Sequence, residues 1–231
     1  MFKRVTPCLD TRHGMLVKGV MFRNMRDLGD PVKFAAKYED DGADELALLD
    51  ITATPENKPT FIEVVKKASE AISIPLSVGG GIRSVEDAVR VMDAGADKVS
   101  VNTAAVKRPD LLRELSDELG SKSVICAIDG KRNAGGWEVY INGGTQPTGM
   151  DMIEWAKGAE SLGAGEILYT GVHTDGMRQG YDIEGLRAIR DAVRIPVTAS
   201  GGAGKLEHFL EALTDGRADA VLAASIFHFN V

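Results

Sequence analysis

The sequence is poor in cysteine and contains no long apolar run. Its two cysteines, Cys8 and Cys126, lie in apolar stretches without a CxxC or histidine-spaced partner, so the sequence indicates neither a disulfide framework nor a metal site. No stretch approaches the ~20 apolar residues that a membrane-spanning helix needs, and the N-terminus lacks the pattern of a secretory signal. We therefore expect a cytoplasmic protein without membrane contacts.

Basic charge is scarce as well. The chain has 27 Lys and Arg against 34 Asp and Glu, a formal net charge of −7, which disfavours nucleic acid as a partner and confines any binding of polyphosphate to a local site. With 44% hydrophobic and 26% charged residues, the composition is far from that of a disordered chain. No linker or shift in composition divides the chain, so we expect one domain over residues 1–231.

Short β-branched runs alternate with amphipathic stretches along the whole chain, which is typical of parallel βα units. Eight strands are expected, at residues 4–9, 45–49, 75–78, 98–102, 124–128, 166–170, 196–199 and 220–224. Seven helices fit between them. Two of these, at 31–41 and 85–94, follow the N-cap residues Asp30 and Ser84.

Eight parallel strands in an undivided chain of this length predict an α/β fold, a closed (β/α)8 TIM barrel. The sequence stops soon after the eighth strand, so the helix that would cover this strand is expected to be absent. An offset of 119 to 122 residues pairs strand-end residues of the two halves: Asp10 with Asp129, Gly80-Gly81 with Gly201-Gly202, and Thr103 with Ser225. This twofold internal repeat predicts half-barrels of about 1–120 and 121–231, and a long substrate with similar ends.

The similar ends are predicted to be phosphates. Glycine-rich turns follow the third and seventh strands, and each opens a helix, so their backbone N–H groups can bind an anion near the helix N-terminus. One strand later each half carries a hydroxyl, Thr103 or Ser225, which matches the phosphate site common in such barrels. A tight turn explains either loop alone equally well, but the duplication favours phosphate binding.

Asp10 and Asp129 end the first and fifth strands, one in each half, and are expected to face each other across the mouth of the barrel. Opposed carboxylates suit proton transfer, with one group as acid and the other as base. An aspartate at a strand end can instead cap the next helix, and that role fits Asp30 and Asp151. For Asp10 and Asp129 the sequence favours catalysis.

Further charged residues lie at both ends of the predicted barrel. Asp50 and Asp175 follow the second and sixth strands, with less defined roles at the mouth. Lys18, in the long first loop, is either a cation that reaches over the substrate or a solvated lysine. At the opposite end, four residues of alternating charge begin strands and are predicted to form either a self-satisfied polar plug or a gate: Arg4, Glu45, Lys98 and Glu166.

Several motifs contain these residues. They are Pro-Cys-Leu-Asp at 7–10, Val-Lys-Gly at 17–19, Leu-Asp-Ile-Thr-Ala at 49–53, Val-Gly-Gly-Gly-Ile-Arg at 78–83, Ala-Asp-Lys-Val-Ser-Val-Asn-Thr at 96–103, Ala-Ile-Asp at 127–129, Asp-Gly-Met-Arg-Gln-Gly-Tyr-Asp at 175–182 and Ala-Ser-Gly-Gly-Ala-Gly-Lys at 199–205. Together they resemble the cyclase-subunit family of imidazole glycerol phosphate synthase, from histidine biosynthesis. The resemblance runs from Lys3 to Phe229.

This resemblance implies a lyase without a metal or cofactor. It implies that ammonia and a bisphosphorylated ribulosyl-formimino aminoimidazole carboxamide ribotide give imidazole glycerol phosphate and aminoimidazole carboxamide ribotide, with Asp10 and Asp129 as the catalytic pair. The charged ring becomes the gate for ammonia from a glutaminase subunit, docked at the N-terminal barrel face in a heterodimer. The implied substrate-binding residues are Lys18, Asp50, Gly80, Gly81, Asn102, Thr103, Thr170, Asp175, Gly176, Ser200, Gly201, Gly202 and Ser225.

The loop after the sixth strand departs from the family pattern. His173 stands where an acid is usual, and Gly171 where a hydroxyl is common, so His173 is either a surface residue or one that alters proton transfer near Asp175. Two other functions stay open: the sister isomerase of the pathway, which rearranges an aldose to a ketose without ammonia, and a non-catalytic bisphosphate-binding or engineered barrel scaffold. The Cys-Leu-Asp start, the Val-Lys-Gly loop and the charged ring favour the cyclase.

Overall fold

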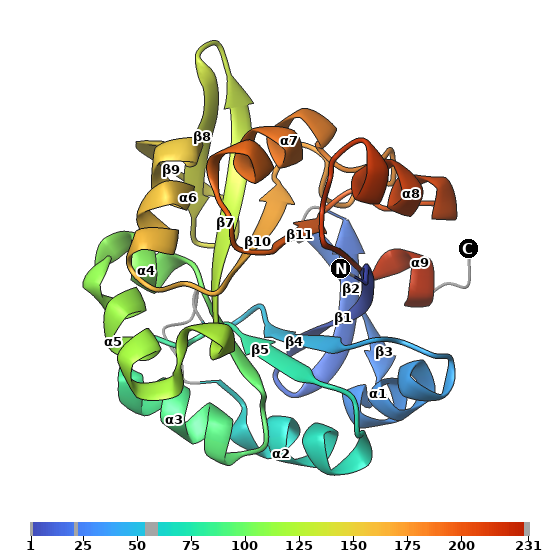
Figure 1. The fold of residues 1–231 in the computed structure, drawn as a ribbon. Helices are drawn as coiled ribbons and strands as arrows, with labels where there is room; N and C mark the ends of the chain where they lie inside the picture. Colours follow the sequence, from blue (N-terminus) through green and yellow to red (C-terminus); the bar gives the residue numbers. More distant parts are fainter. Residues whose placement is uncertain (1, 21–22, 54–59, 229–231) are drawn as a thin grey trace.

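Eight parallel strands close into a barrel in the computed structural model, which describes residues 2–20, 23–53 and 60–228, without the side chains of 18–20 and 23–25. The barrel closes because β12 pairs with β1 and β7 pairs with β10 (Figure 1). In chain order its strands are β1 (Arg4–Arg12), β4 (Leu46–Asp50), β5 (Leu76–Gly79), β6 (Lys98–Val101), β7 (Val124–Asn133), β10 (Glu166–Gly171), β11 (Val197–Ser200) and β12 (Ala220–Ala223). Each overlaps one expected strand, so the predicted TIM barrel is confirmed.

Helices surround the barrel (Figure 1). They are α1 (Pro31–Asp40), α2 (Ile62–Ala71), α3 (Val85–Asp93), α4 (Thr103–Lys107), α5 (Asp110–Leu119), the 3-10 turn η1 (Ser121–Ser123), α6 (Met152–Ser161), α7 (Ile183–Ala192), α8 (Leu206–Thr214) and α9 (Ser225–His228). The expected N-caps are present, because the Asp30 carboxylate accepts the Val32 N–H at 2.9 Å and the Ser84 hydroxyl accepts the Asp87 N–H at 3.2 Å. A short helix, α9, follows the eighth barrel strand, where the sequence predicted none.

Two antiparallel hairpins were not predicted from the sequence. Strand β1 continues past its expected end and pairs with β2 (Met15–Val20), which pairs with β3 (Arg23–Gly29). Strand β7 likewise pairs with β8 (Gly136–Ile141), which pairs with β9 (Gln146–Asp151). The hairpin of β7 and β8 extends beyond the helices between α6 and α7 (Figure 1). Each half of the chain therefore begins with a strand, a hairpin and a helix.

The internal repeat extends to the hydrogen bonds that hold the strands. Asp97 accepts the backbone N–H at the start of β5 at 2.8 Å, and Asp219 accepts the equivalent N–H of β11 at 3.0 Å. In the same way, Glu39 and Glu160 each accept a backbone N–H before these strands, from Ser73 and Arg194, at 2.8 Å. Equivalent carboxylates thus satisfy equivalent backbone donors in the two halves.

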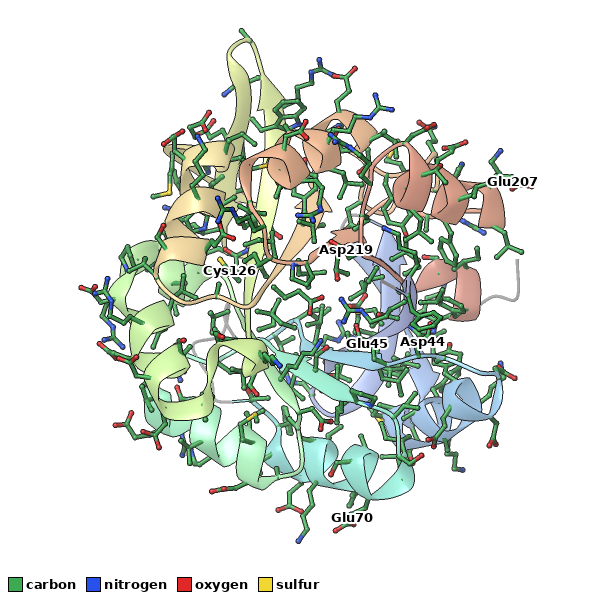
Figure 2. All side chains as sticks on the ribbon, viewed as in Figure 1. Asp44, Glu45, Glu70, Cys126, Glu207 and Asp219 are labelled. Carbon is green, nitrogen blue, oxygen red and sulfur yellow. The ribbon has the colours of Figure 1, made fainter. Side chains whose placement is uncertain are left out.

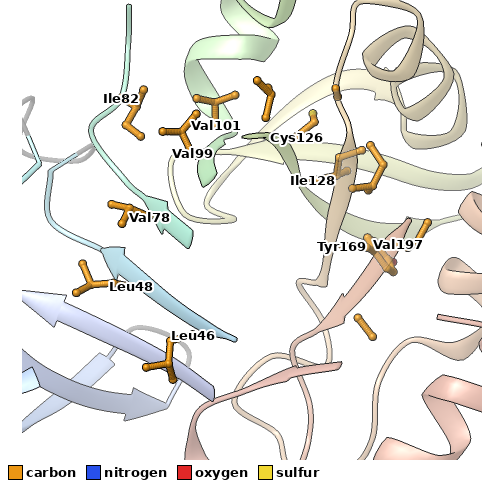
Figure 3. Close-up of a cluster of buried hydrophobic side chains, with 14 of the residues drawn as sticks. Leu46, Leu48, Val78, Ile82, Val99, Val101, Cys126, Ile128, Tyr169 and Val197 are labelled. Atoms are coloured by element: carbon orange, nitrogen blue, oxygen red, sulfur yellow. The ribbon is translucent and has the colours of Figure 1, made fainter. Parts of the chain in front are cut away.

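The core has two layers because successive strand residues point to opposite faces. Side chains such as Leu46, Leu48, Val78 and Val99 fill the space between strands and helices (Figure 3). A smaller cluster lines the barrel interior: Cys8, Ala47, Ile125, Leu168 and Leu222. These five side chains give the interior of the barrel an uncharged, apolar section.

Candidate active site

The carboxyl ends of the barrel strands bring Asp10 and Asp129 to one end of the barrel. In β1, Asp10 lies two residues after Cys8, and in β7, Asp129 lies four residues after Ile125; both of these earlier residues line the interior. The two-residue alternation of a strand therefore turns both carboxylates toward the mouth. The Cys8 thiol lies 3.4 Å from an Asp10 oxygen and donates to it.

Asp129 has an unusual electrostatic environment. Burial and the negative charge of Asp175 raise the pKa of Asp129 to about 7, although hydrogen bonds from the Asn102 side chain and the Gly144 backbone N–H favour its ionised form. A carboxyl group with this pKa is present in both protonation states near neutral pH. Asp129 can therefore donate or accept a proton at physiological pH, which an ordinary aspartate does poorly.

Both glycine loops adopt the left-handed backbone that glycine permits. The φ angles of Gly80 and Gly202 are +90° and +113°. A Cβ atom at Gly80 would lie 2.1 Å from the carbonyl oxygen of Asp50, and one at Gly202 would lie 2.0 Å from that of Gly180. No other residue fits either position, and the turns lead into the N-termini of α3 and α8. Gly81 and Gly201 also have positive φ angles.

The predicted hydroxyl residues stand at the same end of the barrel. Thr103 and Ser225 are the first residues of α4 and α9, and Thr170 and Ser200 lie near the ends of β10 and β11. The Thr103 hydroxyl accepts the backbone N–H of Asn142 at 2.9 Å. These four hydroxyl residues therefore lie at the mouth of the barrel, toward which Asp10 and Asp129 point.

Asn102 is the residue that joins the end of β6 to the start of α4. Its backbone angles, φ −123° and ψ −87°, fall outside the helical and strand regions. Its buried Oδ1 atom has no hydrogen-bond partner among the described residues. A buried oxygen without a hydrogen-bond partner in a native structure calls for an explanation, and this one favours a role for Asn102 at the mouth.

The remaining predicted residues have different surroundings. Asp50 is buried, and one of its oxygens accepts hydrogen bonds from Thr52 and Ala53, so its observed contacts hold the loop that follows β4. Asp175 and Gly176 lie in the loop between β10 and α7. Lys18 falls in β2, but its side chain lies outside the described part of the structure.

The two departures from the family pattern lie in the loop after β10. The His173 ring is partly exposed, and its Nε2 atom lies 3.9 Å from Asp182. A Cβ atom on Gly171 carrying a hydroxyl group would crowd the Thr174 hydroxyl, because the Cβ alone would lie 2.6 Å from it. A larger residue than glycine at this position therefore requires the Thr174 side chain to move.

Four charges form a closed ring at the opposite end of the barrel, as the sequence predicted. Arg4 donates to Glu45 at 2.8 and 2.9 Å and to Glu166 at 3.0 Å, while Lys98 donates to the same two carboxylates at 3.2 and 2.9 Å. Both carboxylates are buried, and Figure 2 shows Glu45 near the barrel centre. Burial alone would raise the pKa of Glu166, but the charges of Lys98 and Arg4 outweigh it and hold that pKa below its ordinary value.

One part of the site was missed by the sequence interpretation. The turn between β8 and β9 supplies the Asn142 N–H to Thr103 and the Gly144 N–H to Asp129. The signal was present, because an Asn-Gly pair, here Asn142-Gly143, marks a hairpin turn between two strand-like runs. Its contact with the barrel mouth joins segments distant in sequence, so no local pattern indicates it.

Two kinds of feature are absent from the described residues. No helix in the described ranges is long and apolar enough to cross a membrane. Within the same part of the chain, no three or more His, Cys, Asp or Glu side chains are arranged to hold a metal ion.

Comparison with known proteins identifies the relatives of this barrel. The family model for histidine biosynthesis proteins matches residues 4–231. A relative from Pyrobaculum aerophilum, imidazole glycerol phosphate synthase subunit HisF, is 57% identical over 230 residues, which cover 99% of this chain and 90% of the relative. A match of this extent, in a barrel with duplicated glycine turns and paired aspartates at its mouth, shows that the chain belongs to the histidine biosynthesis protein family.

Proposed function

We propose that the chain is the cyclase subunit of an imidazole glycerol phosphate synthase and acts as a lyase. It combines ammonia with the bisphosphorylated ribulosyl-formimino aminoimidazole carboxamide ribotide and releases imidazole glycerol phosphate and aminoimidazole carboxamide ribotide. The 57% identity to a HisF subunit supports this reaction. The observation that supports the chemistry is the pKa of Asp129 at the barrel mouth, which is raised to about 7.

The two glycine loops hold the two phosphates of the substrate. The loop at Gly80 and Gly81, with Thr103, binds one phosphate, and the loop at Gly201 and Gly202, with Ser225, binds the other. Positive φ angles at these glycines and the helices that follow them support anion binding by backbone N–H groups. Since the loops follow equivalent strands of the two halves, a substrate bound to both spans the mouth above Asp10 and Asp129.

Asp129 and Asp10 move the protons of the reaction. Ammonia attacks the ketose carbonyl and water leaves, which requires a proton donor, and Asp129 in its protonated form supplies it. Ring closure and cleavage then need a base and an acid in turn, which the pair provides from opposite sides of the mouth. Asn102, Thr170, Asp175, Gly176, Ser200, Lys18 and Asp50 orient the substrate or the loops around it.

The charged ring admits ammonia from a glutaminase partner. Arg4, Glu45, Lys98 and Glu166 close the N-terminal end of the barrel, and a glutaminase subunit docked there in a heterodimer delivers ammonia to them. Beyond the ring, the interior residues Cys8, Ala47, Ile125, Leu168 and Leu222 carry no charge. Such a lining favours neutral ammonia over the ammonium ion, because an unpaired ion in an apolar interior is strongly disfavoured.

A direct assay tests this function. The purified chain is mixed with the ribulosyl substrate and ammonium salt at pH 8 to 9, where ammonia is available without the glutaminase, and loss of substrate absorbance is followed. Turnover that depends on ammonium is the expected result. Isomerisation of the ribosyl precursor without ammonium would instead assign the chain to the sister isomerase, and no turnover of either compound would indicate a non-catalytic barrel.

A single substitution tests the role of Asp129. Asp129→Asn keeps the shape of the side chain but removes its proton, so turnover should fall by at least ~100-fold, as for the loss of a general acid. Substrate affinity, measured by calorimetry, should change little because the glycine loops are untouched. Turnover like that of the unmodified protein would remove Asp129 from the mechanism.

A further inference from the structure

Asp182 holds a buried cluster of hydrogen bonds behind the barrel mouth. One of its carboxylate oxygens accepts the Trp137 indole N–H and the Tyr169 hydroxyl, both at 2.6 Å, and the other accepts the Gly185 backbone N–H at 3.1 Å. His173 lies 3.9 Å from the same carboxylate. Three elements, β8, β10 and α7, thus meet at one buried acid.

This carboxylate ties the three elements together strongly. Asp182 is only 7% exposed, so a lost donor would not be replaced freely by water. The Tyr169 hydroxyl remains a donor, since burial and the charge of Asp182 raise the pKa of Tyr169 far above its ordinary value. Hydrogen bonds to a charged acceptor are stronger than those between neutral groups, which makes this cluster a firm anchor.

Tyr169 connects Asp182 to the strand segment that contains Asp129. Tyr169 neighbours Thr170, which pairs with Asp129 across β10 and β7. The Tyr169 ring also packs against Gly130, where a Cβ atom would lie 2.7 Å from it. The backbone that follows Asp129 therefore packs against the Tyr169 ring, whose hydroxyl group donates a hydrogen bond to Asp182.

Trp137 and the loop after β10 connect Asp182 to two groups that act on Asp129. Trp137 fixes β8, which runs into the turn that supplies the Gly144 N–H to Asp129. Asp182 and His173 flank the loop that carries Asp175, whose charge raises the pKa of Asp129. The described groups that act on Asp129 are Asp175, Gly144 and Asn102, and the first two lie on segments joined to the anchor.

We propose that Asp182, through its bonds to Trp137 and Tyr169, is a positioning residue for Asp129, because it holds the segments that place Gly144 and Asp175 beside that carboxylate. The inference rests on the proposed role of Asp129 in proton transfer. Asp182 itself does not touch the substrate. Its effect reaches the reaction only through the protonation state and position of Asp129.

Two conservative variants test the proposal. Trp137→Phe and Tyr169→Phe each keep an aromatic ring and remove one donor to Asp182. Trp155→Phe is the matched control, because the same substitution is made at a core residue of α6 that donates no hydrogen bond to Asp182. If one of the two test variants does not fold, the other carries the experiment.

Three measurements are made on each variant: amide hydrogen exchange at Gly144, titration of the Asp129 carboxyl by NMR, and the pH profile of kcat/KM with ammonium. With a donor removed, exchange at Gly144 should be at least 10-fold faster. In Trp137→Phe, which loosens β8 and the Gly144 turn but not the loop that carries Asp175, the Asp129 titration should move upward by about half a pH unit or more, since the hydrogen bond that favours the ionised form is weakened. We expect kcat to fall about 10-fold while KM stays within twofold, and Trp155→Phe to leave the profile in place.

The outcomes separate this proposal from the proposed function. Unchanged Gly144 exchange and an unchanged Asp129 titration in a folded test variant would overturn the positioning role. An equal shift in Trp155→Phe would also overturn it, because the effect would then be a general loss of packing. If the titration moves as expected but the activity profile does not follow, Asp182 does position Asp129, and the proton-transfer role of Asp129 fails instead.

Discussion

Asp129 should lower the stability of the folded protein at neutral pH, and Asp129→Asn should restore it. Raising the pKa of this group from 3.8 to about 7 disfavours its ionised folded form by about 4 kcal/mol. Because the side chain is partly exposed, solvent screens part of this penalty, and about 2 to 4 kcal/mol is expected. The asparagine carries no charge and escapes the penalty.

The pH dependence follows from the direction of the shift. The folded pKa lies above the unfolded one, so the stability that protonated Asp129 contributes is fully present below about pH 4. It is lost as the pH rises to about 7. The difference in unfolding free energy between Asp129→Asn and the unmodified protein should therefore be near zero at pH 4. It should grow with rising pH and level off above about pH 7.

Urea unfolding followed by circular dichroism, at several pH values between 4.5 and 8.5, measures this difference. Asp40→Asn, an exposed position on α1, is the control for the same change of charge and should stay within about 0.5 kcal/mol at every pH. A variant at Asp129 that is equally or less stable than the unmodified protein at pH 8 would refute the reasoning. It would mean that the carboxylate is well stabilised as an ion.

Three further substitutions test other parts of the structure. Lys98→Met leaves Glu45 and Glu166 with one cation in place of two, so unfolding should become easier by about 3 kcal/mol, and the melting temperature, followed by calorimetry, should fall by about 6 to 12 °C. Gly80→Ala should destabilise far more than Gly120→Ala, which has a similar φ angle but open space for a Cβ, and only Gly80→Ala should abolish phosphate binding in calorimetry. Asp151→Ala removes the cap that accepts two backbone N–H groups of α6 and should cost about 1 kcal/mol in urea unfolding.

The barrel was predictable because its signals are local. Buried parallel strands are short β-branched runs, such as Val99 to Val101, and the helices between them begin at caps that a single residue defines, such as Asp30. The hairpins were missed because their strands carry mixed polar and apolar side chains. In β8, Gly136–Ile141, four of the six side chains are apolar or aromatic, but only Val139 and Ile141 are buried, because the hairpin lies outside the eight strands that close the barrel.

The site was predictable only in part, for a different reason. Strand ends locate Asp10 and Asp129, because the carboxyl ends of barrel strands share one face. The groups that set the properties of Asp129 arrive from elsewhere. Gly144 reaches it through a hairpin turn, and Asp175 reaches it through a loop anchored at Asp182. Gly144 and Asp175 lie 15 and 46 residues after Asp129 in the sequence. Their contacts with Asp129 depend on the folded path of the chain, which no local pattern specifies.

The duplicated fold raises the question of how two equivalent aspartates come to differ. Identical halves would give Asp10 and Asp129 identical surroundings, so an acid and a base can be distinguished only where the halves diverge. Asn102, which donates to Asp129, corresponds to Ala224 in the other half, and alanine has no amide to donate. Cys8, whose thiol donates to Asp10, corresponds to Ala127. The difference in role proposed for the two carboxylates therefore arises at neighbouring positions such as these and at Asp175, whose charge raises the pKa of Asp129, and not in the aspartates themselves.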